Sequence, residues 1–147
     1  AHGYRGYNGS RAYHGLDFPQ NVQNFIIRNY CQKYNLTFLL SASEYRMPEC
    51  HMILEEVLSS LDTLEGIVLF SIFMLPDDAA KRERIYKMVL DAGRSLHGAL
   101  EDMALTKWDD VQLFEDVLQL NGIARTDQCM DEIGEFLASP ADASVAA

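Results

Sequence analysis

The sequence has few cysteines and no long apolar run. Cys31, Cys50 and Cys129 are odd in number and form no Cys-x-x-Cys or Cys/His pattern, so neither a disulfide framework nor a structural zinc site is expected. The longest apolar run, residues 66–75, is too short to span a bilayer and is interrupted by Ser71. No signal peptide opens the sequence. We therefore expect reduced thiols, a cytoplasmic location and no membrane partner.

Basic side chains are scarce as well. The chain has 12 lysines and arginines against 22 aspartates and glutamates, which gives a formal net charge of -10. Such a surface repels phosphate backbones unless the few basic residues cluster tightly. We therefore expect no nucleic-acid partner.

The common motifs of cofactor and metal chemistry are missing. The sequence holds no Gly-x-Gly-x-x-Gly turn, no P-loop, no Gly-x-Ser-x-Gly elbow and no His-Glu-x-x-His helix. His14 and His51 stand alone in the sequence. We expect no metal and no bound cofactor.

The length and composition of the chain are typical of one soluble globular domain. The chain has 147 residues, of which 48% are hydrophobic and 23% charged, values typical of a single domain with a real core. We expect this domain over residues 1–138. Small residues dominate positions 139–147, for which a flexible tail is expected.

Short apolar runs alternate with segments of helical period. The runs predict strands at residues 4–8, 36–40, 67–76 and 96–100, and the periodic segments predict helices at residues 19–34, 52–61, 79–92, 106–120 and 127–137. Crossovers of this length are right-handed and join parallel strands. The expected fold class is therefore α/β: a three-layer sandwich around a four-stranded, mostly parallel sheet, with flavodoxin-like or resolvase-like alternation.

Polar residues gather where the expected strands end. In open parallel sheets this edge forms the binding crevice, because the following helices point their free amides toward it. The candidates at the strand ends and at the start of the first helix are Ser10, Arg11, Gln20, Asn24, Ser41, Ser43, Glu44, Tyr45, Ser71, Glu101 and Asp102.

Three of the residues in this part of the fold are candidates for proton transfer. His97 and Glu101 are four residues apart on an expected strand, where equal parity places both on one face. An imidazole beside a carboxylate is an acid–base pair that works near neutrality. The alternative is a core His97 with satisfied hydrogen bonds and an exposed Glu101. Glu44, the third candidate, is either a carboxylate over the crevice or a turn residue paired with Arg46.

Other polar residues suit substrate binding. Arg11 beside Ser10 can hold a phosphate or carboxylate through two hydrogen bonds, or can pair with a surface acid. A polar stripe on the first expected helix suits sugar hydroxyls, or is only a solvated helix face or a subunit contact. It consists of Gln20, Gln23, Asn24 and Arg28. The expected binding residues are Ser10, Arg11, Gln20, Asn24, Ser41, Ser43, Tyr45 and Ser71.

Several segments carry a resemblance to a known family. They are Tyr4-Arg5-Gly6-Tyr7 with Ser10-Arg11, residues 19–24, 39–45 and 66–76, and Leu96-His97 with Ala99-Leu100-Glu101. Over residues 4–105 the sequence resembles the sporadic carbohydrate cluster protein family. The resemblance implies a setting among bacterial genes for unusual sugars more firmly than it implies a reaction.

The order of strands and helices also resembles, distantly, the serine recombinase catalytic domain, with Ser10 at the end of the first strand. That resemblance implies an arginine two residues before the serine and paired arginines after the third strand. This chain has Asn8 at the first position and Phe73-Met74-Leu75-Pro76 after the third strand. Together with the acidic charge, these departures argue against DNA strand exchange.

From the residues and the sugar-family resemblance we expect a small enzyme that isomerises, epimerises or dehydrates a sugar or nucleotide-sugar by acid–base catalysis. The alternatives are a non-catalytic partner of a biosynthetic enzyme and a sugar-binding regulator. We also expect a homo-oligomer, because the last helices carry apolar residues that can pack against a second copy. These residues are Trp108, Phe114, Leu118 and Phe136.

Overall fold

A computed structural model describes residues 3–9, 18–47 and 50–120. The chain divides into two compact units, Ala1–Phe114 and Glu115–Ala147. The first unit holds the sheet and its helices. The helix expected at residues 127–137, the expected helix end at Asn121-Gly122 and the expected tail lie outside the described residues, and the single-domain boundary at residue 138 stays a prediction.

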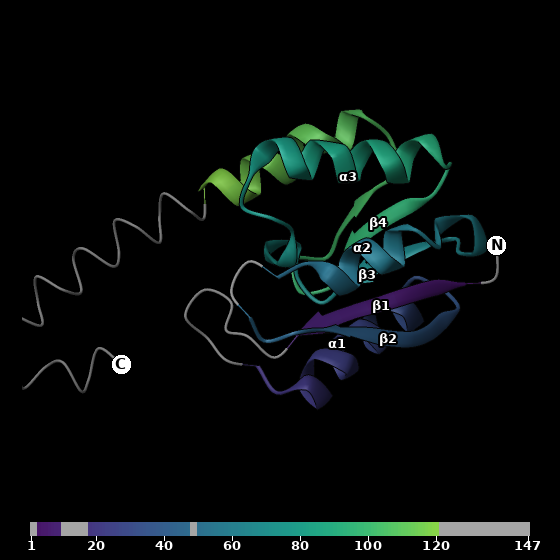
Figure 1. The fold of residues 1–147 in the computed structure, drawn as a ribbon. Coiled ribbons are helices and arrows are strands. Elements are labelled where there is room, and N and C mark those ends of the chain that lie inside the picture. Colours follow the sequence, from purple (N-terminus) through teal and green to yellow (C-terminus); the bar gives the residue numbers. More distant parts are fainter. Residues whose placement is uncertain (1–2, 10–17, 48–49, 121–147) are drawn as a thin grey trace, which may run out of the picture. The chain divides into compact units, whose positions relative to one another are not determined.

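One five-stranded sheet forms the centre of the first unit, with the strand order β2-β1-β3-β4-β5 (Figure 1). Its strands are β1 (Tyr4–Gly9), β2 (Phe38–Glu44), β3 (Gly66–Leu69), β4 (Ser95–Gly98) and β5 (Met103–Leu105). The first four strands are parallel, and β5 runs antiparallel to β4. The mostly parallel sheet is therefore confirmed, with one strand more than expected.

Helices cover both faces of this sheet, which confirms the three-layer α/β fold. They are α1 (Gln20–Lys33), α2 (Met52–Leu58) and α3 (Ala79–Asp91), with 3-10 turns at Leu61–Thr63 and Ile72–Met74. Helix α1 lies on one face of the sheet, and α2 and α3 lie on the other (Figure 1). Residues 109–120 are also helical. No helix in the described ranges is long and apolar enough to cross a bilayer.

Strand β2 is an edge strand and does not have the two covered faces that its apolar run indicated. Leu40 is 74% exposed, and the strand continues to Glu44. Ser41, Ser43 and Glu44 therefore lie in the strand itself, where the sequence indicated a turn. From Ala42 to Glu44 buried and exposed side chains alternate, which places Glu44 on the covered face and Ser43 on the exposed one.

The third and fourth strands are shorter than expected. Strand β3 stops at Leu69, and the Ser71 hydroxyl accepts a hydrogen bond from Phe73 N (3.1 Å) at the start of the 3-10 turn Ile72–Met74. Strand β4 ends at Gly98, and Asp102 takes a φ of 55° in the turn that leads into β5. The parity rule used for His97 and Glu101 does not apply, because Glu101 lies in this turn.

Two of the helices begin with an acidic side chain that accepts hydrogen bonds from nearby amides. Asp78 precedes α3 and accepts from Ala80 N (3.1 Å), so it caps this helix. At the start of the helix at residues 109–120, the Asp110 carboxylate accepts from Thr106 N (2.9 Å) and Lys107 N (3.2 Å).

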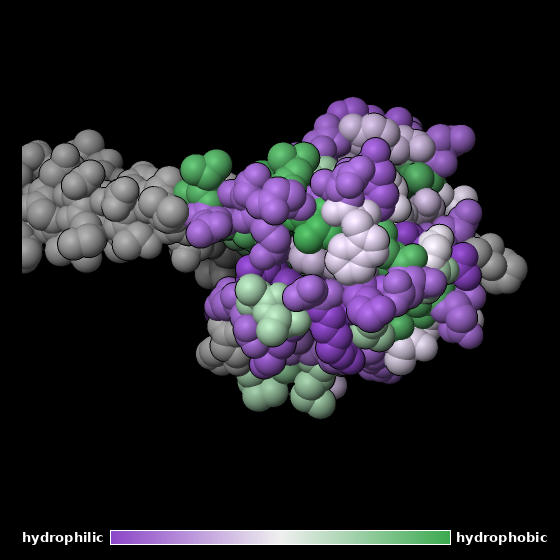
Figure 2. Space-filling view, turned by 90° about the horizontal axis from the view of Figure 1, so that it is seen from above, coloured by the Kyte–Doolittle hydropathy of each residue, from purple (hydrophilic) through white to green (hydrophobic). Residues whose placement is uncertain are grey.

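The apolar residues assigned to an oligomer contact do not all lie on the surface. Phe114 is fully buried, with its ring centroid 6.2 Å from that of Tyr86, so it belongs to the core. Trp108 is about half exposed. Seen from above in Figure 2, hydrophilic side chains predominate and the hydrophobic ones form small scattered groups. The homo-oligomer stays a prediction.

Candidate functional site

A chain of amide and hydroxyl groups joins the ends of β1 and β2 to α1. Asn8 Nδ2 donates to Asn24 Oδ1 (2.7 Å), and Ser43 Oγ donates to Asn8 Oδ1 (2.6 Å). Asn8 is fully buried, so its two partners satisfy it without water. The structure therefore brings together Asn24 and Ser43, two of the predicted binding residues, through a residue that the list of candidates did not include.

Gln23 fixes the end of β1 from the neighbouring turn of α1. Its Nε2 donates to Gly9 O (2.5 Å) and Phe18 O (2.7 Å), and its Oε1 accepts from Gly9 N (3.1 Å). The side chain is fully buried. Sequence reasoning treated Gln23 as part of an exposed stripe, although its spacing to the apolar Ile27 and Tyr30 indicates the buried face of the helix.

Glu44 is buried at the end of β2 and serves as an acceptor for α2. Its carboxylate accepts hydrogen bonds from the Tyr7 hydroxyl (2.7 Å) and from Ile53 N and Leu54 N (3.1 Å each). Burial by itself would raise the pKa of Glu44, but these donors and Tyr45 N outweigh burial and hold the pKa below its ordinary value. These contacts describe a structural anion, and proton transfer by Glu44 stays a prediction.

Glu101 and Ser71 form a second, part-buried pair just beyond the ends of β3 and β4. Ser71 Oγ donates to Glu101 Oε2 (2.6 Å), and Ile72 N donates to Oε1 (2.9 Å). Burial raises the pKa of Glu101, and these hydrogen bonds offset only part of that rise. A carboxyl whose pKa is raised by burial is a candidate for proton transfer. Ser71 is fully buried and Glu101 only partly so, and proton transfer by Glu101 stays a prediction.

His97 lies apart from Glu101, on the α1 side of the sheet. Its Nδ1 is 2.7 Å from the Tyr30 hydroxyl and its Nε2 is 2.8 Å from Ser95 Oγ. Among the described residues no hydrogen bond joins it to Glu101, so the expected acid–base pair is not formed. Burial lowers the pKa of His97 to about 4. Both ring nitrogens are engaged within the core, which favours the structural alternative for this residue.

Stability should fall in mild acid because of His97. The native imidazole stays neutral down to a pKa of about 4, whereas in the unfolded chain it is protonated below its ordinary value of 6.5. The unfolded state therefore binds more protons between these values, and acidification favours unfolding. We expect a loss of about 2 kcal/mol between roughly pH 7.5 and 5 that His97→Gln removes. Urea unfolding at both pH values measures it; an equal loss in the variant would show that another group is responsible.

The remaining predicted residues are placed as follows. Gln20 and Tyr45 are exposed. Ser41 Oγ is buried without a hydrogen-bond partner and faces Gly6, where a Cβ atom would collide with it. Ser10 and Arg11 lie outside the described residues, directly after β1. No three His, Cys, Asp or Glu side chains of the described residues come close enough together to hold a metal ion, and Cys31 and Cys50 are buried free thiols.

Two solved structures share this fold. One is the N-terminal catalytic domain of TP901-1 integrase, with a TM-score of 0.55 and 8% sequence identity, covering 83% of this chain and 97% of that domain. The other is a resolvase family site-specific recombinase from Streptococcus pneumoniae, with a TM-score of 0.57 and 9% identity, covering 92% of this chain and 99% of that one. No family model and no curated protein matches the sequence. The distant fold resemblance to recombinase domains is confirmed.

These comparisons overturn the functional expectation. The prediction of a sugar-pathway isomerase or lyase is wrong, because no comparison supports a carbohydrate family and the structures that share the fold are named as an integrase catalytic domain and a site-specific recombinase. The partner expectation, a sugar and no nucleic acid, is wrong for the same reason. The expectation of no nucleic acid depended on net charge, which averages over a surface and does not say where the cations lie.

The recombinase-like edge of this chain differs from the pattern that the resemblance implies. At the position two residues before Ser10 stands Asn8, buried and hydrogen-bonded to Asn24 and Ser43. After β3 come the buried Ile72, Met74 and Leu75 of the 3-10 turn and its end. At these two positions, therefore, the described residues supply no guanidinium group to a phosphate.

Proposed function

We propose that this chain is a resolvase-fold domain that binds DNA at the carboxyl ends of its parallel strands and does not exchange strands. The observation that carries the proposal is the extent of the fold match, which covers 97% and 99% of two recombinase structures. A match over a whole domain includes the edge at which ligands bind in open α/β sheets. Because fold alone does not fix function, the residues at that edge supply the rest of the support.

Phosphate binding at this edge needs donors and cations, and the chain offers both. Arg46 follows β2 and is exposed, and the sequence between β1 and α1 includes Ser10 and Arg11. Helix α1 begins without a side-chain cap and has no acidic residue in its first turn, so its first amides remain available to an anion. We assign phosphate contacts to Ser10, Arg11, Gln20 and Arg46.

Strand exchange requires more than phosphate binding, because phosphoryl transfer needs cations around the reacting phosphate. The buried Asn8 offers a neutral amide that is already engaged with Asn24 and Ser43. The buried apolar side chains after β3 offer none. The arrangement therefore supports binding of a DNA backbone without cleavage by Ser10.

Fluorescence anisotropy with a labelled DNA duplex tests the proposal. We expect binding at about 50 mM salt that weakens steeply as salt rises, because each neutralised phosphate releases counterions. Arg11→Gln and Arg46→Gln should each weaken binding roughly threefold to tenfold. The control is Arg28→Gln, which removes an arginine stacked on Phe38 and should leave binding unchanged. Equal losses in all three variants would indicate non-specific attraction and contradict the assigned edge.

A further inference from the structure

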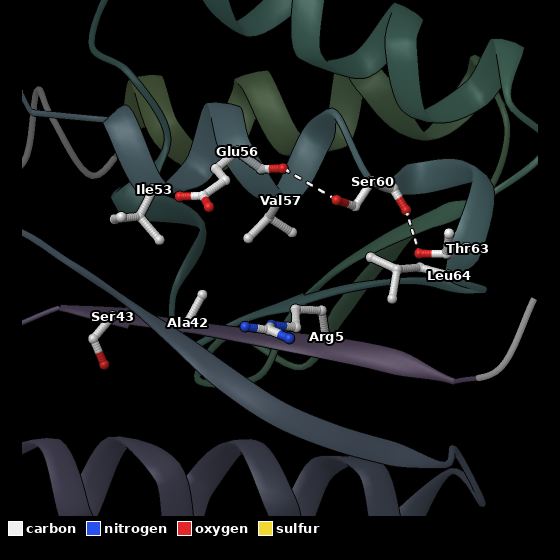
Figure 3. A pocket seen from close by; sticks show the side chains of 9 residues that line it. All are labelled: Arg5, Ala42, Ser43, Ile53, Glu56, Val57, Ser60, Thr63 and Leu64. Carbon is white, nitrogen blue, oxygen red and sulfur yellow. Dashed lines mark hydrogen bonds between the residues drawn. The ribbon is translucent and has the colours of Figure 1, made fainter.

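A cavity lies between the sheet and α2, and its lining runs from Arg5 near the start of β1 to Ser43 near the end of β2. Its volume is about 500 Å³, within the range of small-ligand sites. It is lined by Arg5, Ala42, Ser43, Ile53, Glu56, Val57, Ser60, Thr63 and Leu64 (Figure 3). We call it the Arg5 pocket.

Arg5 is the unusual residue of this pocket because no described residue provides an acceptor for its guanidinium group. Its Nε is buried and has no hydrogen-bond partner, and none of the ion pairs among the described residues includes Arg5. Arginine stays protonated in proteins. A part-buried cation without a counter-ion costs free energy, so the group is a donor for a ligand that the pocket can hold.

The rest of the lining combines an apolar surface with one competing acid. Ala42, Ile53, Val57 and Leu64 supply apolar contacts. In Figure 3 the Arg5 side chain lies beneath Val57, between the strands and α2, and Glu56 extends from α2 on the same side. Glu56 forms no ion pair with Arg5. Glu56 is the acidic residue of the lining, and it would compete with any acidic ligand.

The hydroxyl groups at the far end of the pocket already donate hydrogen bonds to backbone carbonyls. Ser60 Oγ lies 3.5 Å from Glu56 O, and Thr63 Oγ1 donates to Ser60 O (2.8 Å). Their oxygen lone pairs can still accept from a ligand hydroxyl or amide. Arg5 thus remains the strongest donor that is not engaged within the pocket.

We propose that the Arg5 pocket binds a small organic anion, with the carboxylate or phosphate of the ligand paired to the Arg5 guanidinium and the organic body on the apolar wall. The planar fork of arginine matches either oxyanion through two hydrogen bonds. The pocket volume admits a ligand of aromatic-ring size. The anchoring residue differs from those assigned to the DNA edge, because Arg5 is the second residue of β1 and its side chain lies under α2, while Ser43 of the lining lies near the end of β2.

Isothermal titration with a matched pair of probes tests the site. Phenyl phosphate and benzoate share a ring and differ in the anionic head, and benzyl alcohol is the neutral control. We expect binding of at least one anion and none of the alcohol. Arg5→Met should weaken that binding at least tenfold, and Glu56→Gln should strengthen it several-fold by removing the competing charge. Arg84→Gln, which breaks only an exposed pair with Glu55, should change nothing.

Folding of the variants can be checked independently. Arg5→Met removes an unpartnered charge, so its melting temperature should equal or exceed that of the wild type. Thr63→Trp, at an exposed position of the lining, should block binding while Arg5 stays in place. Binding of neither anion, or equal binding by Arg5→Met, would overturn the proposal. The DNA-edge variants Arg11→Gln and Arg46→Gln should bind the probes normally, so failure of one proposal is separable from failure of the other.

Discussion

Replacing Glu44 by alanine should lower the free energy of unfolding by about 4 kcal/mol, because the change leaves several buried donors without an acceptor. The carboxylate accepts from Ile53 N, Leu54 N and the Tyr7 hydroxyl, and its residue is only 3% exposed. Helix α2 has seven residues, too short to form without such support. Urea unfolding followed by circular dichroism at neutral pH measures the loss.

The pKa of Glu44 gives this prediction a second signature. Its native pKa lies below the ordinary value, so its stabilising contribution is present above the unfolded pKa and is lost as the pH falls through the native pKa. The difference between wild type and Glu44→Ala should shrink accordingly in acid. Glu83→Ala, an exposed acid on α3, is the matched control and should cost little. If Glu44→Ala left the free energy of unfolding unchanged, the structural role would be contradicted, and the catalytic role predicted from the sequence would be the alternative.

Gln23→Leu should be nearly as damaging, with a loss of about 3 kcal/mol, because leucine keeps the volume and removes every hydrogen bond. Gly9 would lose partners for both its N–H and its carbonyl oxygen, and Phe18 would lose the donor to its carbonyl. These groups fix the end of β1, immediately before Ser10. We expect the variant to lose DNA affinity as well as stability.

Gln32→Leu provides the comparison, since it makes the same change at an exposed position of α1. Its unfolding free energy and its anisotropy titration should match those of the wild type. If Gln23→Leu kept its stability, the hydrogen bonds to Gly9 would not hold the strand end. If it lost stability but kept DNA affinity, the position of Gly9 would not matter for binding.

The alternation of strands and helices could be predicted from the sequence because apolar period is a local property. The burial of the run before Glu44 was predicted wrongly because position in the sheet is not a local property. Leu40 is 74% exposed, and β2 is an edge strand of the sheet that the described residues form. Strand β5 was missed because Met103–Leu105 has three residues, too few to show an alternating pattern.

The candidate site was predicted in its location more than in its contacts. The strand-end rule identified Ser43, Ser71 and Glu101, and the start of α1 added Asn24. It could not show that Glu44 caps α2, or that His97 turns to Tyr30 and away from Glu101. Such partners come from different elements, and their distances follow from packing. Nothing in the sequence around Arg5 indicated a site, because only the structure shows that its buried Nε has no hydrogen-bond partner.

The acidic net charge misled the choice of partner for a related reason. A formal charge of -10 weakens attraction to DNA at long range, but contacts at short range depend on a few arginines at one edge. Several cations are engaged elsewhere, since Lys33, Arg84 and Lys87 pair with acids on the surface. Arg46 is at the strand-end edge and forms no such pair with another described residue.

The central claim is that this resolvase-fold domain binds DNA without cutting it, and one measurement tests both halves. Supercoiled plasmid is incubated with the protein and with Ser10→Ala, then run on a native gel for retardation and on a denaturing gel for nicks and covalently attached protein. We expect the wild type and Ser10→Ala to retard the plasmid, with no nicks and no adduct. Nicks or an adduct that depend on Ser10 would contradict the claim, as would the absence of any retardation at low salt.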